Sequence, residues 1–175
     1  MQNGRDSHRP RLRRVSLTTF IFVSAVACAG TRRGNGTDPF VGSWKMNVAR
    51  SNVGGLVAKA KQVTLTIHRE GPWVTKTVDF VNGDNTSREF IYRLKYDGKD
   101  YPGIPTAKDP NPNTMAAHFT GPKSLEQIEK HNGHVVARYQ QSLSDDASTL
   151  TVHHVIVHES TGNVIRENIE VFERQ

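Results

Sequence analysis

From residue 40 to residue 174, apolar and polar side chains alternate in a series of short segments. The clearest segment is 89–96, in which every even position is aromatic or Leu. A period of two places successive side chains on opposite faces of a β-strand, whereas a helical pattern repeats about every 3.6 residues. The alternation therefore predicts that most of the chain forms strands.

Turn signals separate these segments at intervals of about ten residues. Asn82-Gly83, Asp97-Gly98 and Asn132-Gly133 readily adopt the positive φ angles of two-residue hairpin turns. Such short connections cannot contain a crossover helix, so consecutive strands should be antiparallel neighbours. An open meander would expose two hydrogen-bonding edges. We therefore predict one all-β domain, a single antiparallel up-and-down β-barrel of eight to ten strands. Its closure should pair the segment of Trp44 with that of Phe172.

Two stretches interrupt the alternation. Residues 49–60 show no strand pattern, which predicts a helical turn or a loop over one barrel end. Residues 102–112 contain four prolines and predict an irregular loop. A brief strand near Asp100–Tyr101 is compatible with the pattern.

The first 27 residues have the features of a signal peptide. Residues 1–14 carry five arginines against one acid, and residues 15–27 carry no charge. As a helix, this uncharged stretch would span roughly 20 Å, which is too short for a hydrocarbon core of ~30 Å. A basic start, a short apolar stretch and small residues at its end are typical of a signal peptide. The sequence therefore predicts an exported protein, either periplasmic, secreted or lipid-anchored in the cell envelope.

Cys28, the only cysteine, follows this leader directly. No intrachain disulfide is therefore available to stabilise the fold. Ala25–Cys28 loosely resembles a bacterial lipobox, in which the cysteine is acylated and becomes the mature N-terminus. The alternative is export without lipid, with Cys28 left unmodified or removed with the leader. Residues 28–38 are rich in Gly and predict a flexible tether, which leaves 39–175 as the barrel domain.

The net charge of +6 does not describe the predicted domain. Basic residues concentrate in the leader and tether, and from Asp38 onward the acidic and basic residues are equal in number. Nucleic-acid binding needs a basic patch or stripe, which this part of the sequence lacks. We therefore expect no nucleic-acid partner, and membrane contact only through a lipid anchor on Cys28.

Short motifs resemble the calycin superfamily of ligand-binding barrels. Gly42-Ser43-Trp44 resembles the G-x-W signature on the first strand of lipocalins, and Phe40–Met46 resembles the opening of the intracellular lipid-binding proteins. Val171–Arg174 resembles the final strand of these ten-stranded barrels. The stretch Lys95–Pro102 is similar to small exported bacterial proteins with a lipocalin-like domain. The resemblance implies a calycin-type barrel and small apolar ligands.

The resemblance also brings out two departures. Fatty-acid binders of the ten-stranded class hold the ligand carboxylate with an Arg-x-Tyr pair on the last strand, where this chain has Glu170 and Phe172. An inward Glu170 would repel a carboxylate. The helical lid of the family would be shortened to residues 49–60. An apolar, neutral or cationic ligand is therefore expected rather than a fatty acid.

Two interpretations of the barrel interior remain open at this point. About eight strands give an interior that side chains fill, whereas ten strands leave room for a guest molecule. In the first case the aromatic residues form a solid core, and the protein is a structural or interaction domain of the cell envelope. In the second case we predict a ligand cavity lined by Trp44, Phe90, Tyr92, Tyr96, Tyr139, Glu170 and Phe172.

Catalytic and metal-binding patterns are weak in this sequence. It contains neither a G-x-S-x-G motif nor a phosphate-binding Gly loop, and we expect a non-enzymatic protein without a cofactor. His131 and His134 should face each other across a hairpin, either as two metal ligands or as solvated turn residues. A further alternative is a haem-dependent enzyme with an inward His154 or His118 as the ligand.

Overall fold

The computed structural model describes residues 38–175 of the chain. The predicted signal peptide, Cys28 and all but the last residue of the predicted tether lie outside the described residues. Ten strands and two short helical turns make up the described part. The helical turns are η1 (Val48–Arg50) and α1 (Gly55–Ala58). The strands are β1 (Gly42–Met46), β2 (Ala60–Glu70), β3 (Trp73–Asn82), β4 (Ser87–Leu94), β5 (Tyr101–Ile104), β6 (Thr114–Gly121), β7 (Ser124–His131), β8 (His134–Leu143), β9 (Thr149–Val157) and β10 (Val164–Arg174).

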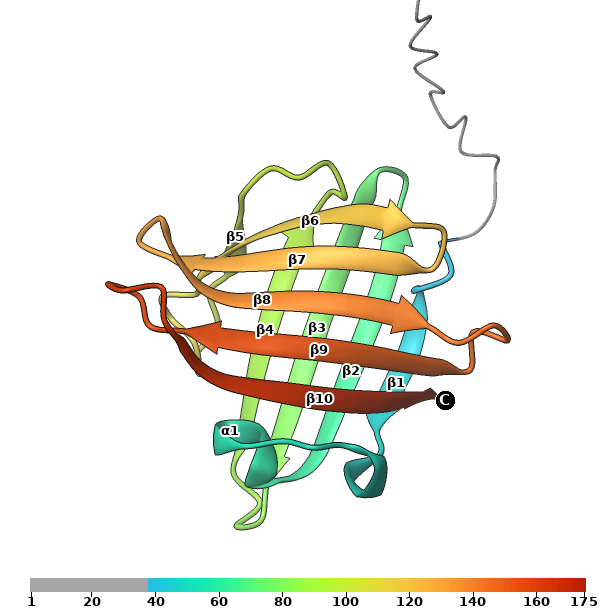
Figure 1. Cartoon of the computed structure of the whole chain (residues 1–175), viewed down its shortest axis with the longest axis horizontal. Coiled ribbons are helices and arrows are strands. Elements are labelled where there is room, and N and C mark those ends of the chain that lie inside the picture. Colours follow the sequence, from blue (N-terminus) through green and yellow to red (C-terminus); the bar gives the residue numbers. More distant parts are fainter. Residues whose placement is uncertain (1–37) are drawn as a thin grey trace, which may run out of the picture. The chain divides into compact units, whose positions relative to one another are not determined.

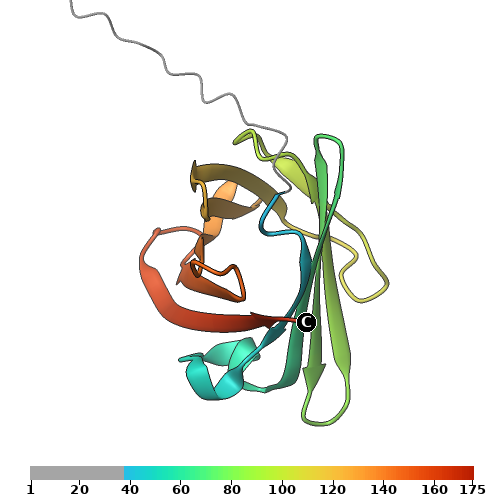
Figure 2. The ribbon, with the colours of Figure 1, turned by 90° about the vertical axis from the view of Figure 1, so that its right-hand side faces the viewer.

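The strands form a closed barrel in which each strand pairs with its neighbours in the chain, as Figures 1 and 2 show. All pairings are antiparallel, and β1 closes the barrel by pairing with both β2 and β10. Met46 of β1 lies opposite Phe172 of β10. The predicted fold class, an all-β up-and-down barrel closed by its first and last strands, is confirmed.

Alternation places one set of side chains inside the barrel. In β2, for example, Val63, Leu65 and Ile67 are buried while the residues between them are more exposed. A polar residue that stands at one of these alternate positions also points into the barrel. Five buried polar side chains of the strands do so: Lys76, Gln127, Gln141, Asn168 and Glu170.

Aromatic packing fills one end of the barrel. Trp44 is fully buried, and its Nε1 donates a hydrogen bond of 2.9 Å to the carbonyl oxygen of Phe40. The guanidinium of Arg174 lies 4.2 Å from the Trp44 ring centroid, a cation–π contact. The ring of Phe119 meets that of Tyr96 at 4.9 Å and that of Phe40 at 6.0 Å. This end is a solid core.

The opposite end carries the interruption predicted for residues 49–60. It forms η1 and α1 with a short connection between them, and α1 lies beside the start of β2 (Figure 1). None of the helices among residues 38–175 has both the length and the apolar character needed to cross a membrane.

The prediction of an irregular loop over 102–112 is wrong at its start, because Pro102–Ile104 belong to β5. Pro102 lies opposite Thr114, and the N–H of Gly103 supplies a hydrogen bond of 2.9 Å to the carbonyl oxygen of Asn113. A Cβ at Gly103 would lie 2.6 Å from Cβ of Pro112. Gly103 therefore allows the close approach that lets a proline-containing segment join the sheet.

Candidate functional site

A cavity of about 380 Å³ occupies the barrel interior toward the end covered by α1. This volume falls within the usual range for small-molecule sites. Residues from eight strands and from the α1 segment line the cavity. Because the interior is hollow here, the interpretation of a barrel filled throughout by its own side chains is wrong.

The predicted lining residues divide into two groups. Phe90, Tyr92, Tyr139, Glu170 and Phe172 line the cavity. Trp44 and Tyr96 do not line it, because both lie in the aromatic core of the opposite end. They point inward as expected, but their strand positions place them beyond the hollow part of the barrel.

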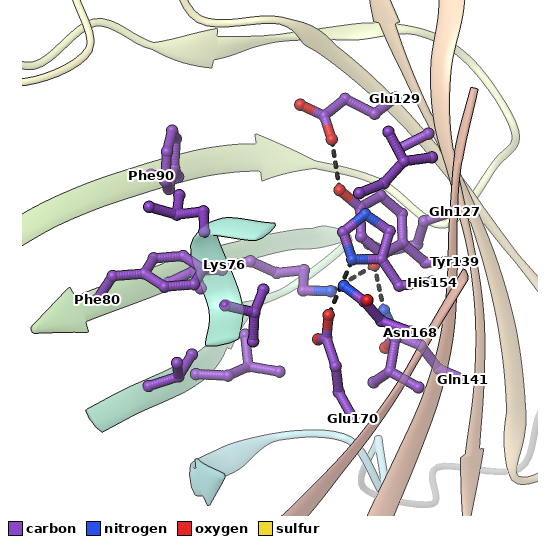
Figure 3. A pocket seen from close by; sticks show the side chains of 18 of the residues that line it. Lys76, Phe80, Phe90, Gln127, Glu129, Tyr139, Gln141, His154, Asn168 and Glu170 are labelled. Atoms are coloured by element: carbon purple, nitrogen blue, oxygen red, sulfur yellow. Dashed lines mark hydrogen bonds and ion pairs between the residues drawn. The ribbon is translucent and has the colours of Figure 1, made fainter. Parts of the chain in front are cut away.

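Apolar side chains form one side of the cavity, seen at the left of Figure 3. Phe80 and Phe90 meet there edge to face, with ring centroids 5.8 Å apart. Val78 of β3 and Val63 of β2 also line the cavity. This surface can bind hydrocarbon through burial of apolar area.

Lys76 projects into the cavity from β3. It occupies an inward position between Val74 and Val78, and only 5% of its surface is exposed. Its Nζ donates a hydrogen bond of 2.5 Å to Oε1 of Gln127 on β7. Burial lowers the pKa of Lys76 to about 7, although the charges of Asp38 and Glu170 partly oppose this shift. An amine and its protonated form therefore both exist near neutral pH.

Buried amides surround the end of Lys76, as Figure 3 shows. Gln141 Nε2 donates to the same Gln127 Oε1 that accepts from Lys76. Gln127 Nε2, Gln141 Oε1 and Asn168 Nδ2 are buried without a hydrogen-bond partner among residues 38–175. A buried polar atom without a partner is costly, so these three atoms favour a polar group of a guest or water.

Glu170 of β10 is paired with His154 of β9. The His154 Nδ1 and Glu170 Oε1 atoms lie 2.8 Å apart, and each side chain is nearly nine-tenths buried. The His154 ring stacks on Tyr139 with a centroid distance of 4.2 Å. His154 is thus an inward residue, whereas His118 is exposed on the outside of β6 beside Glu126. Of the two histidines considered as interior ligands, only His154 reaches the cavity.

Glu129 provides a second carboxylate at the cavity wall. It accepts hydrogen bonds from Tyr139 at 2.5 Å, from Asn113 at 2.7 Å and from Tyr92 at 3.3 Å. Burial, together with the charge and hydrogen bonds of Glu129, raises the pKa values of Tyr92 and Tyr139 well above their ordinary value. Both phenols therefore stay protonated as hydrogen-bond donors at neutral pH.

Asn168 and Arg166 connect the cavity to the α1 segment. The N–H of Gly54 donates a hydrogen bond of 2.9 Å to Oδ1 of Asn168, which holds the residue before α1 against β10. Arg166 packs against Gly54 and Gly55, and it lines the cavity together with Leu56 and Val57 of α1. The α1 segment and the start of β10 thus line one end of the cavity together.

The predicted His131–His134 pair is confirmed in its register, since the two residues face each other across the β7–β8 hairpin. Nδ1 of His131 lies 2.9 Å from Oδ1 of Asn113. Among residues 38–175, no group of three or more His, Cys, Asp or Glu side chains is arranged to hold a metal ion. Within the described part of the chain, this pair thus lacks the further ligands that a metal site needs.

Sequence reasoning missed five residues of the polar side: Lys76, Gln127, Glu129, Gln141 and Asn168. The sequence did contain a signal for them, because each stands an even number of positions from an inward-pointing apolar residue of its own strand. Gln127 follows Leu125 by two positions, for example, and Gln141 precedes Leu143 by two. Polar residues at inward positions were the clue to a polar interior.

Solved structures of known proteins share the fold of this chain. Comparison of the sequence with models of protein families and with curated proteins gives no match. Among solved structures, the chain is similar to a point mutant of the fluorescent protein UnaG, with a TM-score of 0.53, 16% identity and coverage of 78% of this chain and 96% of that chain. It is also similar to a Schistosoma mansoni fatty acid binding protein in complex with arachidonic acid (TM-score 0.54, 14% identity, 78% of this chain and 96% of that chain). A third similar structure is the zebrafish ileal bile acid-binding protein complexed with cholic acid (TM-score 0.50, 11% identity, 78% and 99%).

At these identities the likeness establishes architecture. The chain has the closed, ten-stranded, calycin-like fold that fatty-acid-binding proteins also have. Within that fold, the polar side of this chain's cavity is formed by Lys76, Gln127 and Glu170 with their hydrogen-bond partners.

Proposed function

We propose that this protein binds a small hydrophobic molecule that carries an uncharged, oxygen-containing polar group. The observation that carries the proposal is the cavity itself, with an apolar side at Phe80 and Phe90 and a buried polar side at Lys76, Gln127 and Asn168. Small-molecule sites are typically mostly apolar with a few placed polar groups. The two similar structures whose ligands are stated hold arachidonic acid and cholic acid, which supports a hydrophobic guest in this kind of barrel.

The polar side favours an oxygen acceptor on the ligand. Gln127 Nε2 and Asn168 Nδ2 are buried donors without a partner in residues 38–175, and Lys76 Nζ adds a further donor. A carbonyl or hydroxyl oxygen can satisfy such donors. A ligand oxygen bound there accepts hydrogen bonds from these amides. Without it the amides stay buried and unpaired, which is costly.

Charge argues against a carboxylate ligand. Two carboxylates, Glu129 and Glu170, line the cavity, and the amine of Lys76 has a pKa of about 7 because of its burial. The permanent cation of the lining, Arg166, is exposed to solvent at the α1 end, where its charge is screened. A third carboxylate would meet like charge in a site of low polarity. This supports the sequence-based preference for a neutral or cationic molecule over a fatty acid.

The test is displacement of a neutral fluorescent probe, Nile red, by molecules with equal chains and different head groups. Decan-1-ol and 2-decanone should displace the probe at lower concentration than decanoate. Val78→Trp fills the cavity and should abolish probe binding, whereas Thr77→Trp on the same strand leaves the cavity unfilled. Binding that survives Val78→Trp in a folded protein, as judged by circular dichroism, would contradict the proposal.

The location of the protein is a further part of the proposal. We propose that residues 1–27 direct export and that 28–38 tether the binding domain, with or without a lipid on Cys28. The basic, apolar and small-residue pattern of the leader supports export. The intact mass of protein recovered from the producing cell's envelope fraction distinguishes cleavage, acylation and an uncut leader. An uncut chain in the cytoplasmic fraction would contradict export.

A further inference from the structure

We propose that Lys76 captures the carbonyl carbon of an apolar aldehyde as an imine inside the cavity. The inference rests on the proposed function, because the aldehyde must first bind in the same cavity without a covalent bond. It narrows the ligand class from oxygen-bearing hydrophobic molecules to carbonyl compounds.

The surroundings of Lys76 are unusual for a lysine. Lysine side chains are seldom fully buried unless they are paired with an opposite charge. Lys76 is 5% exposed, lies between the inward residues Val74 and Val78, and uses an amide oxygen of Gln127 as its hydrogen-bond partner. Its neighbours across the sheet are Ile67 and Tyr92. Within residues 38–175, this amine forms no ion pair with a carboxylate, and its hydrogen-bond partner is a neutral amide.

The uncharged amine is the form that attacks a carbonyl, and burial makes it available. Desolvation lowers the pKa of Lys76 to about 7, against the opposing charges of Asp38 and Glu170. The other titratable groups that line the cavity are Glu129, His154, Tyr92, Tyr139 and Arg166. A lysine desolvated in an apolar pocket is a recognised route to an activated amine that forms Schiff bases. Exposed lysines, with ordinary pKa values near 10.4, remain almost entirely protonated at the same pH.

The chemistry is a balanced condensation. The lone pair of Lys76 Nζ forms a bond to the carbonyl carbon, and the carbonyl π electrons move to the oxygen, which takes up a proton. The nitrogen loses one proton, which gives a neutral carbinolamine. The C–O bond then breaks, the oxygen leaves as water with both hydrogens that the amine originally carried, and a C=N bond forms. The step needs no oxidant or reductant.

The groups around Lys76 suit this reaction. Gln127 Nε2 and Asn168 Nδ2 are unpaired donors within residues 38–175 and can hold the carbonyl oxygen as negative charge develops on it. His154, 2.8 Å from Glu170, lines the same cavity and is a side chain able to exchange a proton with the carbinolamine. The apolar side at Phe80 and Phe90 can hold the hydrocarbon chain of the aldehyde in the same cavity.

The experiment uses the full chain and decanal as the probe. The protein is incubated with decanal near pH 7.5, sodium borohydride is added to reduce any imine to a stable secondary amine, and the modified lysine is located by peptide mass mapping. We expect one dominant adduct on Lys76, on the order of tenfold more abundant than the adduct on the exposed Lys45. Lys76→Met should lose the dominant adduct, and Lys45→Met should keep it.

Several outcomes decide the inference. Adducts spread evenly over exposed lysines, and unchanged in Lys76→Met, would overturn it. The mapping on the unsubstituted chain decides the matter even where Lys76→Met fails to fold. Nile red displacement by decan-1-ol separates this inference from the proposed function. If decan-1-ol displaces the probe but decanal leaves no adduct on Lys76, covalent capture is wrong and non-covalent binding stands. If neither compound displaces the probe, the proposed function fails, and the inference fails with it.

Discussion

Lys76 on β3 and Gln127 on β7 meet inside the barrel, with 2.5 Å between Lys76 Nζ and Gln127 Oε1. The two strands are not neighbours in the sheet, so this hydrogen bond crosses the interior. Gln141 donates to the same oxygen from β8. The amide oxygen itself brings no full charge to the amine. Burial therefore lowers the pKa of Lys76 to about 7, although the charges of Asp38 and Glu170 act in the opposite direction. The charge of the cavity therefore changes within the neutral pH range.

The first prediction concerns stability and pH. The pKa of Lys76 is about 7 in the folded protein against an ordinary value of 10.5, so between these pH values the unfolded chain binds more protons than the folded one. Stability should therefore rise with pH through this window, by at most about 1.4 kcal/mol per pH unit, and Lys76→Met should abolish that rise. Urea unfolding between pH 7 and pH 9.5 measures the slope.

A difference in slope between the unsubstituted chain and Lys76→Met can be assigned to Lys76 for two reasons. The four tyrosines whose pKa values are raised with burial as the largest cause lower stability only as their unfolded forms ionise near pH 10, at the upper end of this range, and they do so equally in both variants: Tyr92, Tyr96, Tyr101 and Tyr139. Lys45→Met removes an exposed amine and should leave the slope unchanged. Equal slopes for the unsubstituted chain and Lys76→Met would show that Lys76 does not have a lowered pKa.

The second prediction concerns ligand charge. Glu170→Gln removes a carboxylate from the cavity while keeping an oxygen that can contact His154. Repulsion of an anionic ligand should fall, so decanoate should bind on the order of tenfold more tightly relative to decan-1-ol. Displacement of Nile red by each compound gives the ratio.

Glu167→Gln is a matched control for this change. Glu167 lies on the same strand and faces outward, where its Oε2 is 3.1 Å from Nε2 of His153. The two variants thus remove the same charge from the outside and the inside of the barrel. An unchanged ratio for Glu170→Gln, or an equal change for Glu167→Gln, would argue against a charge effect inside the cavity.

The third prediction separates stability from binding. Trp44 is fully buried in the aromatic end, where its ring contacts Arg174 and its Nε1 donates a hydrogen bond to Phe40. It does not line the cavity. Trp44→Ala should lower the free energy of unfolding by about 3–5 kcal/mol, because a large buried ring is lost. Nile red affinity of the folded fraction should stay within about twofold of the unsubstituted chain. A larger loss of affinity at a temperature where the protein is folded would place Trp44 in the binding site.

The strand pattern made the fold predictable because alternation and Asn-Gly turns are local signals. Each strand of a closed antiparallel meander pairs with its neighbours in the chain, so no long-range information was needed for the order. Parity also assigned the inward face of segment 89–96 correctly, since Tyr92, Leu94 and Tyr96 are buried. Alternation does not say how far along the barrel axis an inward residue lies. For that reason Trp44 and Tyr96 were expected in the cavity but lie in the solid end.

The polar side of the cavity was not predictable in the same way. Lys76 and Gln127 are 51 positions apart, and their contact depends on the register and tilt of strands on opposite walls. Local pattern places each residue inside the barrel but does not say which polar groups meet there. The pairing of His154 with Glu170 has the same origin, since it follows from the β9–β10 register.

The last prediction concerns the end of the cavity that α1 lines. Gly55, the first residue of α1, has a φ of +62°, and a Cβ added there would collide with the guanidinium of Arg166. Gly55→Ala should therefore lower stability by about 1 kcal/mol, because a residue with a Cβ is disfavoured at this φ. It should also displace Arg166 and loosen α1 over the cavity, so that Nile red dissociates faster in stopped-flow dilution. Gly83→Ala is the control, since Gly83 has no positive φ and a Cβ there would meet nothing within 4 Å. Equal dissociation rates for the two variants would mean that guests do not leave past α1.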